Sequence, residues 1–196
     1  MKYMVSKRRL AKDIVDIAKA EKTSIDQWWV EPFAGGGNLI TEVPFLNRLG
    51  SDCNPNTISA LCSIRDYRKE LPKDNRDFSE LDYYIARDNE SYPHRGYIGF
   101  ALSYGGKWFG GWRRDRLGKR DYVREAYDNA VLQSKKLDGI SLLCSDFLDL
   151  DIPENSIVYC DPPYKGTTKY ATDFDHEVFF TWCRCLAAKG HVVLVS

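Results

Sequence analysis

The sequence predicts an α/β protein with a doubly wound, mostly parallel sheet of the Rossmann type, and three observations carry this prediction. Short apolar runs alternate with helical patterns along the chain, as in parallel sheets with helical crossovers. A glycine-rich turn at 31–37 follows the first apolar run. The tetrapeptide Asp161-Pro162-Pro163-Tyr164 follows the apolar run 156–160, at the strand end where open α/β sheets bind their ligands.

The individual elements follow from periodicity. Leu10, Ile14 and Ile17 fall on one face of a helix, whereas an unbroken apolar run such as 156–160 is typical of a buried parallel strand. We expect strands at 27–31, 49–52, 140–144, 157–160 and 191–195. We expect helices at 7–20, 38–46, 55–67 and 174–188.

One segment, 68–136, breaks this alternation. It is polar and aromatic, shows no clear strand period and is too long for a plain crossover. We interpret it as an inserted sub-domain of helices and loops, so that 1–67 and 137–196 form the sheet domain. Inserted segments beside a ligand crevice often recognise the substrate.

Composition limits the class of protein. The 196 residues are 43% hydrophobic and carry 28 basic and 28 acidic side chains, which favours a soluble globular domain with a sizeable core. Apolar runs are too short to span a bilayer, and the basic N-terminus lacks the apolar segment of a secretory signal. The six cysteines show no zinc-binding spacing, so we expect reduced thiols, no metal, no membrane partner and a cytoplasmic location, in a bacterial or phage-infected host cell.

The charge is unevenly distributed despite the zero net charge. A basic run at 107–124 begins among the aromatic residues Trp108, Phe109 and Trp112. Such a run is often only a solvated helix face, but interleaved aromatic and basic residues favour a nucleic-acid surface. The residues predicted to contact nucleic acid are Lys107, Arg113, Arg114, Arg116, Arg120 and Arg124.

A second set of residues suits an adenosine ligand. Asp52 ends a strand about twenty residues after the glycine-rich turn, where an acid binds a ribose diol, although it could also simply cap the next helix. Asp146 and Phe147 end the third strand and offer an acceptor and a ring for an adenine. The turn lacks the lysine and Ser/Thr of a phosphate loop, so the expected ligand needs no phosphate; S-adenosylmethionine is one such ligand.

The tetrapeptide suits a flat heterocycle. Two prolines stiffen the loop, so that the Asp161 carboxylate, the Pro162 carbonyl and the Tyr164 ring are held in fixed relation. Two acceptors can bind an exocyclic amino group while the ring stacks on the base. An ordinary strand-to-loop turn is the alternative, since Asp-Pro commonly opens turns.

Taken together, these pieces resemble Dam-like DNA adenine-N6 methyltransferases, especially short phage-type members. The resemblance covers nearly the whole chain, in the family's order. It rests on the segments 2–7, 31–37, 52–55, 103–111, 145–147 and 161–164.

The resemblance implies a role for each matching position. The cofactor S-adenosylmethionine would be bound by Tyr3, Lys7, Phe33, Gly35, Gly37, Asp52, Asp146, Phe147 and Asp161. Asp161, Pro162 and Tyr164 would hold a flipped-out adenine for direct methyl transfer. The insert would recognise the target in double-stranded DNA, and we expect a monomer or a weak dimer.

Two departures from the family pattern keep other functions open. Val5 replaces a frequent glycine, and we expect the final helix and C-terminal strands of the family's sheet to be missing. A catalytically inactive DNA- or cofactor-binding protein is therefore one alternative. Methylation of another planar amine is the other: the N4 amine of cytosine, adenine in RNA or a glutamine amide.

Overall fold

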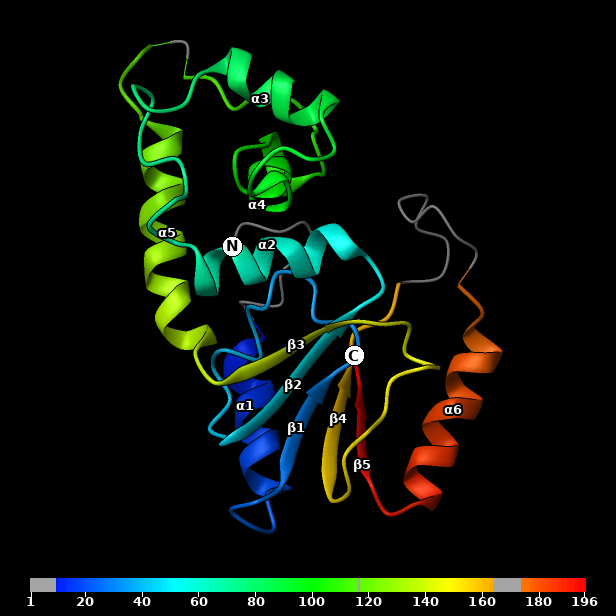
Figure 1. Cartoon of the computed structure of the whole chain (residues 1–196). Helices are drawn as coiled ribbons and strands as arrows, with labels where there is room; N and C mark the ends of the chain where they lie inside the picture. Colours follow the sequence, from blue (N-terminus) through cyan, green and yellow to red (C-terminus); the bar gives the residue numbers. More distant parts are fainter. Residues whose placement is uncertain (1–9, 116, 164–173) are drawn as a thin grey trace.

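The computed structural model describes residues 10–115, 117–163 and 174–196, and its centre is one parallel sheet (Figure 1). The strand order is β3-β2-β1-β4-β5, and every pair is parallel. The strands are β1 (Trp28–Glu31), β2 (Asn47–Asp52), β3 (Ile140–Cys144), β4 (Ser156–Cys160) and β5 (Val192–Val195). The predicted α/β class and parallel sheet are confirmed. Since β1 and β4 are neighbours, the chain reverses its direction of winding between them, which is where such sheets bind ligands.

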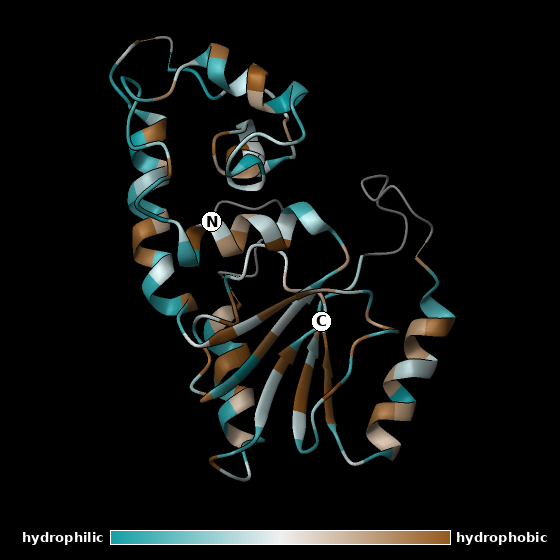
Figure 2. Ribbon diagram, viewed as in Figure 1, coloured by the Kyte–Doolittle hydropathy of each residue, from teal (hydrophilic) through white to brown (hydrophobic). Residues whose placement is uncertain are grey.

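Helices cover both faces of this sheet. They are α1 (Ala11–Ala20), α2 (Pro55–Asp66), α3 (Glu80–Asp88), α4 (Arg95–Ala101), α5 (Tyr122–Leu137) and α6 (His176–Ala188), with a short 3-10 turn η2 (Tyr104–Gly106). Buried side chains of α1, α2, α4 and α5 form one core with Trp29 of β1, whereas α6 packs with Val30 and Val158 on the other face. Figure 2 shows hydrophobic residues along β3, β4 and β5, whereas the helices combine hydrophobic and hydrophilic residues.

The helix predicted at 38–46 is wrong. This segment consists of turns, with a bond from the Glu42 amide to the Leu39 carbonyl at 2.8 Å, and β2 begins directly at Asn47. Proline at position 44 lacks an amide hydrogen and pushes Val43 away from helical geometry, so fewer than two helical turns fit before it. The apolar residues of the segment other than the exposed Pro44 and Leu46 are nevertheless buried, which explains their misleading helical spacing.

The insert is anchored on the sheet domain by a close helix crossing. Helix α4 packs on α2 at Gly96, where an added Cβ would lie 2.6 Å from the Asn56 carbonyl oxygen and 2.8 Å from the Ala60 amide nitrogen. Only glycine permits this approach, since both contacts are with backbone. The core of the insert is thus continuous with that of the sheet, and its status as a separate sub-domain, 68–136, stays a prediction.

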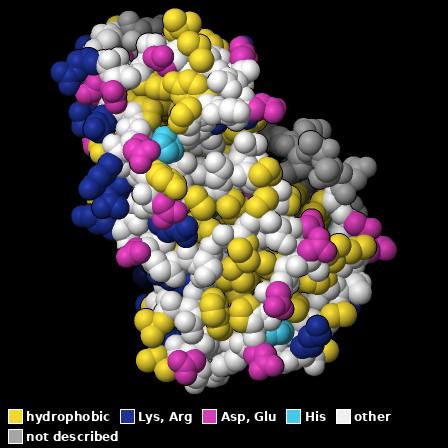
Figure 3. Space-filling view, viewed as in Figure 1, with side chains coloured by type: hydrophobic (Ala, Val, Ile, Leu, Met, Phe, Trp, Pro, Cys, Tyr) yellow, Lys and Arg dark blue, Asp and Glu magenta, His cyan; other side chains and the backbone are white. Residues whose placement is uncertain are grey.

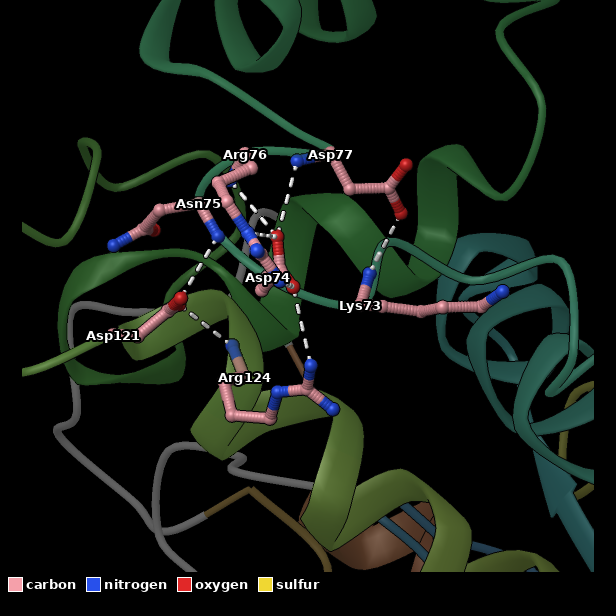
Figure 4. Close-up of polar contacts among 7 residues, drawn as sticks. All are labelled: Lys73, Asp74, Asn75, Arg76, Asp77, Asp121 and Arg124. Carbon is pink, nitrogen blue, oxygen red and sulfur yellow. Dashed lines mark hydrogen bonds and ion pairs between the residues drawn. The ribbon is translucent and has the colours of Figure 1, made fainter.

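A polar junction holds the start of α5 against the loop before α3 (Figure 4). The Asp74 carboxylate accepts hydrogen bonds from the Arg76 guanidinium at 2.8 Å and from Arg124 of α5 at 3.1 Å. The bond from the Arg76 side chain is the main cause that lowers the pKa of Asp74 below the usual range. Asp121 caps α5 by accepting from the Arg124 amide at 2.8 Å, and it also accepts from the Asn75 amide at 2.9 Å. The basic side chain of Arg124 is therefore part of the fold of the insert.

Candidate active site

Acidic side chains follow the carboxyl ends of four neighbouring strands. Glu31 ends β1, Asp52 ends β2, Asp146 follows β3 and Asp161 follows β4. Because parallel strands place these ends on one edge of the sheet, residues 130 positions apart converge at the winding reversal between β1 and β4. The candidate site is this edge.

The glycine-rich turn is tied to Asp52. The Gly35 amide donates to Asp52 Oδ2 at 3.0 Å, and the Asn54 amide donates to Oδ1 at 2.9 Å. Gly35 and Gly37 have φ angles of 49° and 63°, a region that favours glycine. Burial raises the pKa of Asp52, and the two amide bonds oppose this rise. A fixed carboxylate with remaining lone pairs thus faces the turn, as binding of a ribose diol requires.

Helix α5 supports the same turn through a contact that the sequence does not reveal. The buried Gln133 side chain donates from Nε2 to the Gly36 carbonyl at 2.8 Å, across 97 positions of sequence. A Cβ on Gly37 would lie 3.1 Å from Leu61 of α2, so the turn is also packed closely against that helix. The turn is therefore held in shape by α2, which precedes the insert, and by α5, the last helix of the insert.

An aromatic cluster forms the wall beside Asp146. The rings of Phe33 and Phe147 lie 5.5 Å apart, and both contact Phe179 of α6. Phe147 is only 7% exposed, so it can offer an adenine little more than a ring edge, whereas Phe33 is half-buried. Asp146 is exposed, with Oδ1 accepting from the Leu148 amide at 3.0 Å. The wall and the acceptor predicted from Asp146 and Phe147 therefore lie side by side at the end of β3.

Asp161 is held by the end of β5. The Ser196 amide donates to the Cys160 carbonyl at 3.1 Å, which places the Ser196 hydroxyl 3.3 Å from Asp161 Oδ1. The Tyr159 hydroxyl in turn donates to Ser196 Oγ at 2.9 Å. Pro162 is buried directly after Asp161. This chain of contacts orients the carboxylate at the switch point.

Glu31 is an acid at the site to which the sequence alone gave no role of its own. Its side chain is 3% exposed, and Oε1 accepts a hydrogen bond from the Trp29 indole at 2.8 Å. Burial raises the pKa of Glu31 to about 8; the indole bond opposes this rise and the nearby charge of Asp161 adds to it. The signal in the sequence is a carboxyl group that closes a buried apolar strand.

The basic run is largely engaged in contacts within the insert. Arg113 is buried, lies 4.2 Å over the Tyr122 ring and approaches Glu125 at 3.4 Å. Arg120 pairs with Glu125 at 2.8 Å, and Arg114 forms an ion pair with Glu80. Lys107 is exposed in the loop after α4. Arg113 is better explained by packing than by contact with a partner, because its side chain is only 8% exposed.

Four predicted site residues, Tyr3, Lys7, Arg116 and Tyr164, lie outside the described residues. Across the ranges that the structure describes, His, Cys, Asp and Glu side chains form no group of three or more that could hold a metal ion. Within the same ranges, no helix is both long enough and apolar enough to pass through a bilayer.

Comparison with known families shows the family of this chain. The model of the D12 class N6 adenine-specific DNA methyltransferases matches residues 3–104, just over half of the 196 residues. The chain belongs to this family. The match spans the glycine-rich turn, Glu31, Asp52 and the first part of the insert. No curated protein was found to match the chain.

Membership of the D12 family gives the converging acids a chemical context. DNA adenine is the substrate class that the family name states, and the Rossmann-type sheet agrees with it. The matched region ends at residue 104, so the family match does not extend to Asp146, Phe147 or Asp161. Their roles rest on the geometry of the sheet edge.

Proposed function

We propose that this protein transfers the methyl group of S-adenosylmethionine directly to the N6 amine of a flipped-out adenine in double-stranded DNA. The observation that carries the proposal is the convergence of Asp52, the glycine-rich turn and Asp161 on one sheet edge in a member of the D12 family. The proposal goes beyond the family assignment by naming the cofactor, the mechanism and the residues.

The groups at this edge of the sheet suit S-adenosylmethionine. A fixed Asp52 carboxylate, glycine backbone at positive φ and an aromatic wall offer an acceptor for a diol, a close approach of backbone and an apolar surface. In our proposal Asp52 holds the ribose, Asp146 and Phe147 flank the adenine, and Phe33, Gly35 and Gly37 line the methionine. Tyr3 and Lys7 complete the site as the family resemblance implies. When bound, S-adenosylmethionine supplies a methyl group already activated by its sulfonium.

Asp161 acts on the target amine. The lone pair of an adenine amine is delocalised into the ring, which makes the nitrogen a poor nucleophile. Hydrogen bonds from its N–H groups to Asp161 and the Pro162 carbonyl favour a more tetrahedral nitrogen and stabilise the positive charge that grows in the transition state. Tyr164 stacks on the base once it has left the duplex. Alignment of the reacting atoms supplies the remaining rate enhancement.

The insert would supply the DNA surface. Lys and Arg side chains gather along the edge of the molecule that α5 forms (Figure 3). Exposed ion pairs such as Arg120–Glu125 contribute at most about 1 kcal/mol, so a DNA phosphate can replace the glutamate at little cost. We keep Lys107, Arg114, Arg116 and Arg120 as proposed phosphate contacts. Arg124 stays with them because its side chain is 46% exposed despite its bond to Asp74, whereas the buried Arg113 is left out.

The direct test of the function is a transfer assay. The protein is incubated with methyl-labelled S-adenosylmethionine and unmethylated double-stranded DNA, and the digested nucleosides are separated. N6-methyladenosine in its deoxy form is the expected product. Label in N4-methylcytosine, or in RNA but not DNA, would overturn the assigned substrate, and absence of label with folded protein would overturn the assigned activity.

Replacing Asp52 with alanine should weaken cofactor binding. The ribose diol loses a charged acceptor, which corresponds to about 1.5–3 kcal/mol, or roughly 10- to 150-fold in Kd. Titration calorimetry with S-adenosylmethionine measures this directly. Asp26→Ala, which removes an exposed carboxylate before β1, at the end of the strand opposite to the site, is the matched control and should leave Kd unchanged. Equal affinities for wild type and Asp52→Ala would remove Asp52 from the cofactor site.

Neutralising three exposed basic residues of the insert should weaken DNA binding for all sequences alike. In the triple variant Lys107→Gln, Arg114→Gln and Arg120→Gln, each lost phosphate contact lowers the slope of log K against log salt by about 0.9. We therefore expect the slope to fall by between one and about three units, measured by fluorescence anisotropy between low and physiological salt.

A charge-matched control separates local contacts from net charge. Lys19→Gln, Arg184→Gln and Lys189→Gln remove the same charge from α1 and from α6 and its C-cap. The control should keep the wild-type salt slope, and both triple variants should keep their affinity for the cofactor. If both lower the slope equally, the basic run of the insert is only a solvated face.

A further inference from the structure

The buried carboxyl group of Glu31 is the feature of the site that the proposed transfer mechanism leaves unused. Val30 pairs with Val158, so Glu31 lies one residue and Asp161 three residues beyond this pair, on adjacent strands and toward the same edge. Glu31 is 3% exposed, and its one described hydrogen bond comes from the neutral Trp29 indole. An ionised carboxylate in such a place needs a positive partner.

The described surroundings offer Glu31 acids but no cation. Asp161 follows the neighbouring strand β4, and Asp52 lies two residues beyond Gly50, which pairs with Glu31 in β2. Asp146 follows β3 at the same edge. Among the described residues, no ion pair involves Glu31. Among the described residues, this edge of the sheet thus gathers acids, and Glu31 is the one that is fully buried. Lys7, which the proposed function places at the cofactor site, lies outside the described residues.

Two states of Glu31 follow from this geometry. In the free protein, burial and the charge of Asp161 both favour the neutral acid, which still accepts the indole hydrogen bond. A bound cation beside the carboxyl group reverses the balance, because it stabilises the carboxylate and completes the desolvated pair. S-adenosylmethionine is such a cation, since its sulfonium adds a positive charge to the amino acid moiety.

We propose that Glu31 is the carboxyl group that balances the positive charge of the cofactor: it is protonated in the free protein and releases its proton when S-adenosylmethionine binds. This inference rests on the proposed function, and it adds a binding residue and a coupling between cofactor affinity and pH. The proton balance is simple: the neutral acid and the cofactor give a carboxylate–cofactor pair and one proton to solvent.

Proton release is measured by titration calorimetry in buffers that differ in their enthalpy of ionisation. With a free pKa of about 8, Glu31 is about 90% protonated at pH 7, so wild type should release up to about 0.9 more protons than Glu31→Gln. The difference between the two proteins is the readout, because the amino group of the cofactor itself also titrates near this range. At pH 9.5 the difference should vanish.

Affinity gives a second readout from the same titrations. Between pH 6 and 7.5, the Kd of wild type should improve about tenfold per pH unit relative to that of Glu31→Gln, as linkage requires. Asp52→Asn is the matched control: it should weaken binding yet keep the wild-type proton release. Equal proton counts and parallel pH profiles for wild type and Glu31→Gln would overturn this inference while leaving the proposed function intact.

Measured binding of the cofactor separates failure of the proposed function from failure of the role proposed for Glu31. If folded wild-type protein does not bind S-adenosylmethionine at millimolar concentration, both the proposed function and the role of Glu31 are overturned. If Glu31→Gln does not fold, carbon-13 labelling of the glutamate carboxyl groups answers the question in wild type. One signal should titrate near pH 8 in the free protein and show the ionised shift at pH 7 after the cofactor is added; an ionised signal in both states would overturn the inference.

Discussion

Replacing Asp161 with alanine is expected to lower the rate of methyl transfer about 100- to 1000-fold while cofactor affinity changes by no more than a few fold. The variant loses the acceptor that stabilises charge on the target nitrogen in the transition state, and the loss of one such contact typically has this size. The glycine-rich turn is held by Asp52 and Gln133, so the cofactor site keeps its shape. Single-turnover rates under saturating cofactor and DNA measure the effect.

Two further variants sharpen this result. Asp161→Asn keeps an acceptor oxygen but no charge, so its rate should fall between those of wild type and Asp161→Ala. Asp151→Ala removes an exposed carboxylate elsewhere in the sheet domain and should keep the wild-type rate. Near-wild-type turnover by Asp161→Ala would show that the amine is not held by this carboxylate.

Replacing Glu31 with glutamine is expected to flatten the dependence of stability on pH. The folded pKa of about 8 lies above the ordinary glutamate pKa of 4.5, so the folded state binds the extra proton between these limits. The contribution of Glu31 to stability is then fully present below about pH 4.5 and is lost as pH rises through about 8. A shift of this size corresponds to about 4 to 5 kcal/mol of unfolding free energy.

Urea denaturation of the free protein at several pH values between 5 and 9 tests this prediction. Wild type should lose stability with rising pH more steeply than Glu31→Gln, and the variant should be the more stable of the two at pH 9. Glutamine preserves the oxygen that accepts from the Trp29 indole, so the comparison isolates the charge. Parallel stability profiles would contradict the protonated state of Glu31 in the free protein.

Both experiments probe the same edge of the sheet. Asp161 is half-buried and is oriented by Ser196, which suits it to contact with the substrate. Glu31 is buried at the end of the neighbouring strand, which suits it to balancing charge. Cofactor binding, as proposed, would change the charge of the site before DNA arrives. The pH dependence of cofactor affinity and that of the transfer rate can therefore be separated experimentally.

The sequence by itself determined the fold class and the strand ends that matter. Buried apolar runs such as 156–160 are strands because only a parallel sheet covered on both faces hides them, and topology then carries the residues that follow, Asp52 and Asp161, to one edge. These signals are local in the chain, so periodicity and turn chemistry suffice. The motif segments also predicted the methyltransferase family.

Only the tertiary structure decided the features that depend on distant partners. Pro44 and long-range burial turned the expected helix at 38–46 into packed turns. Arg113 resembles its basic neighbours in sequence, but Tyr122 and Glu125 enclose it. Glu31 became a candidate charge partner because burial and Asp161 act on it across strands. In each case the deciding energy comes from desolvation and contact between residues far apart in the chain, which no local pattern records.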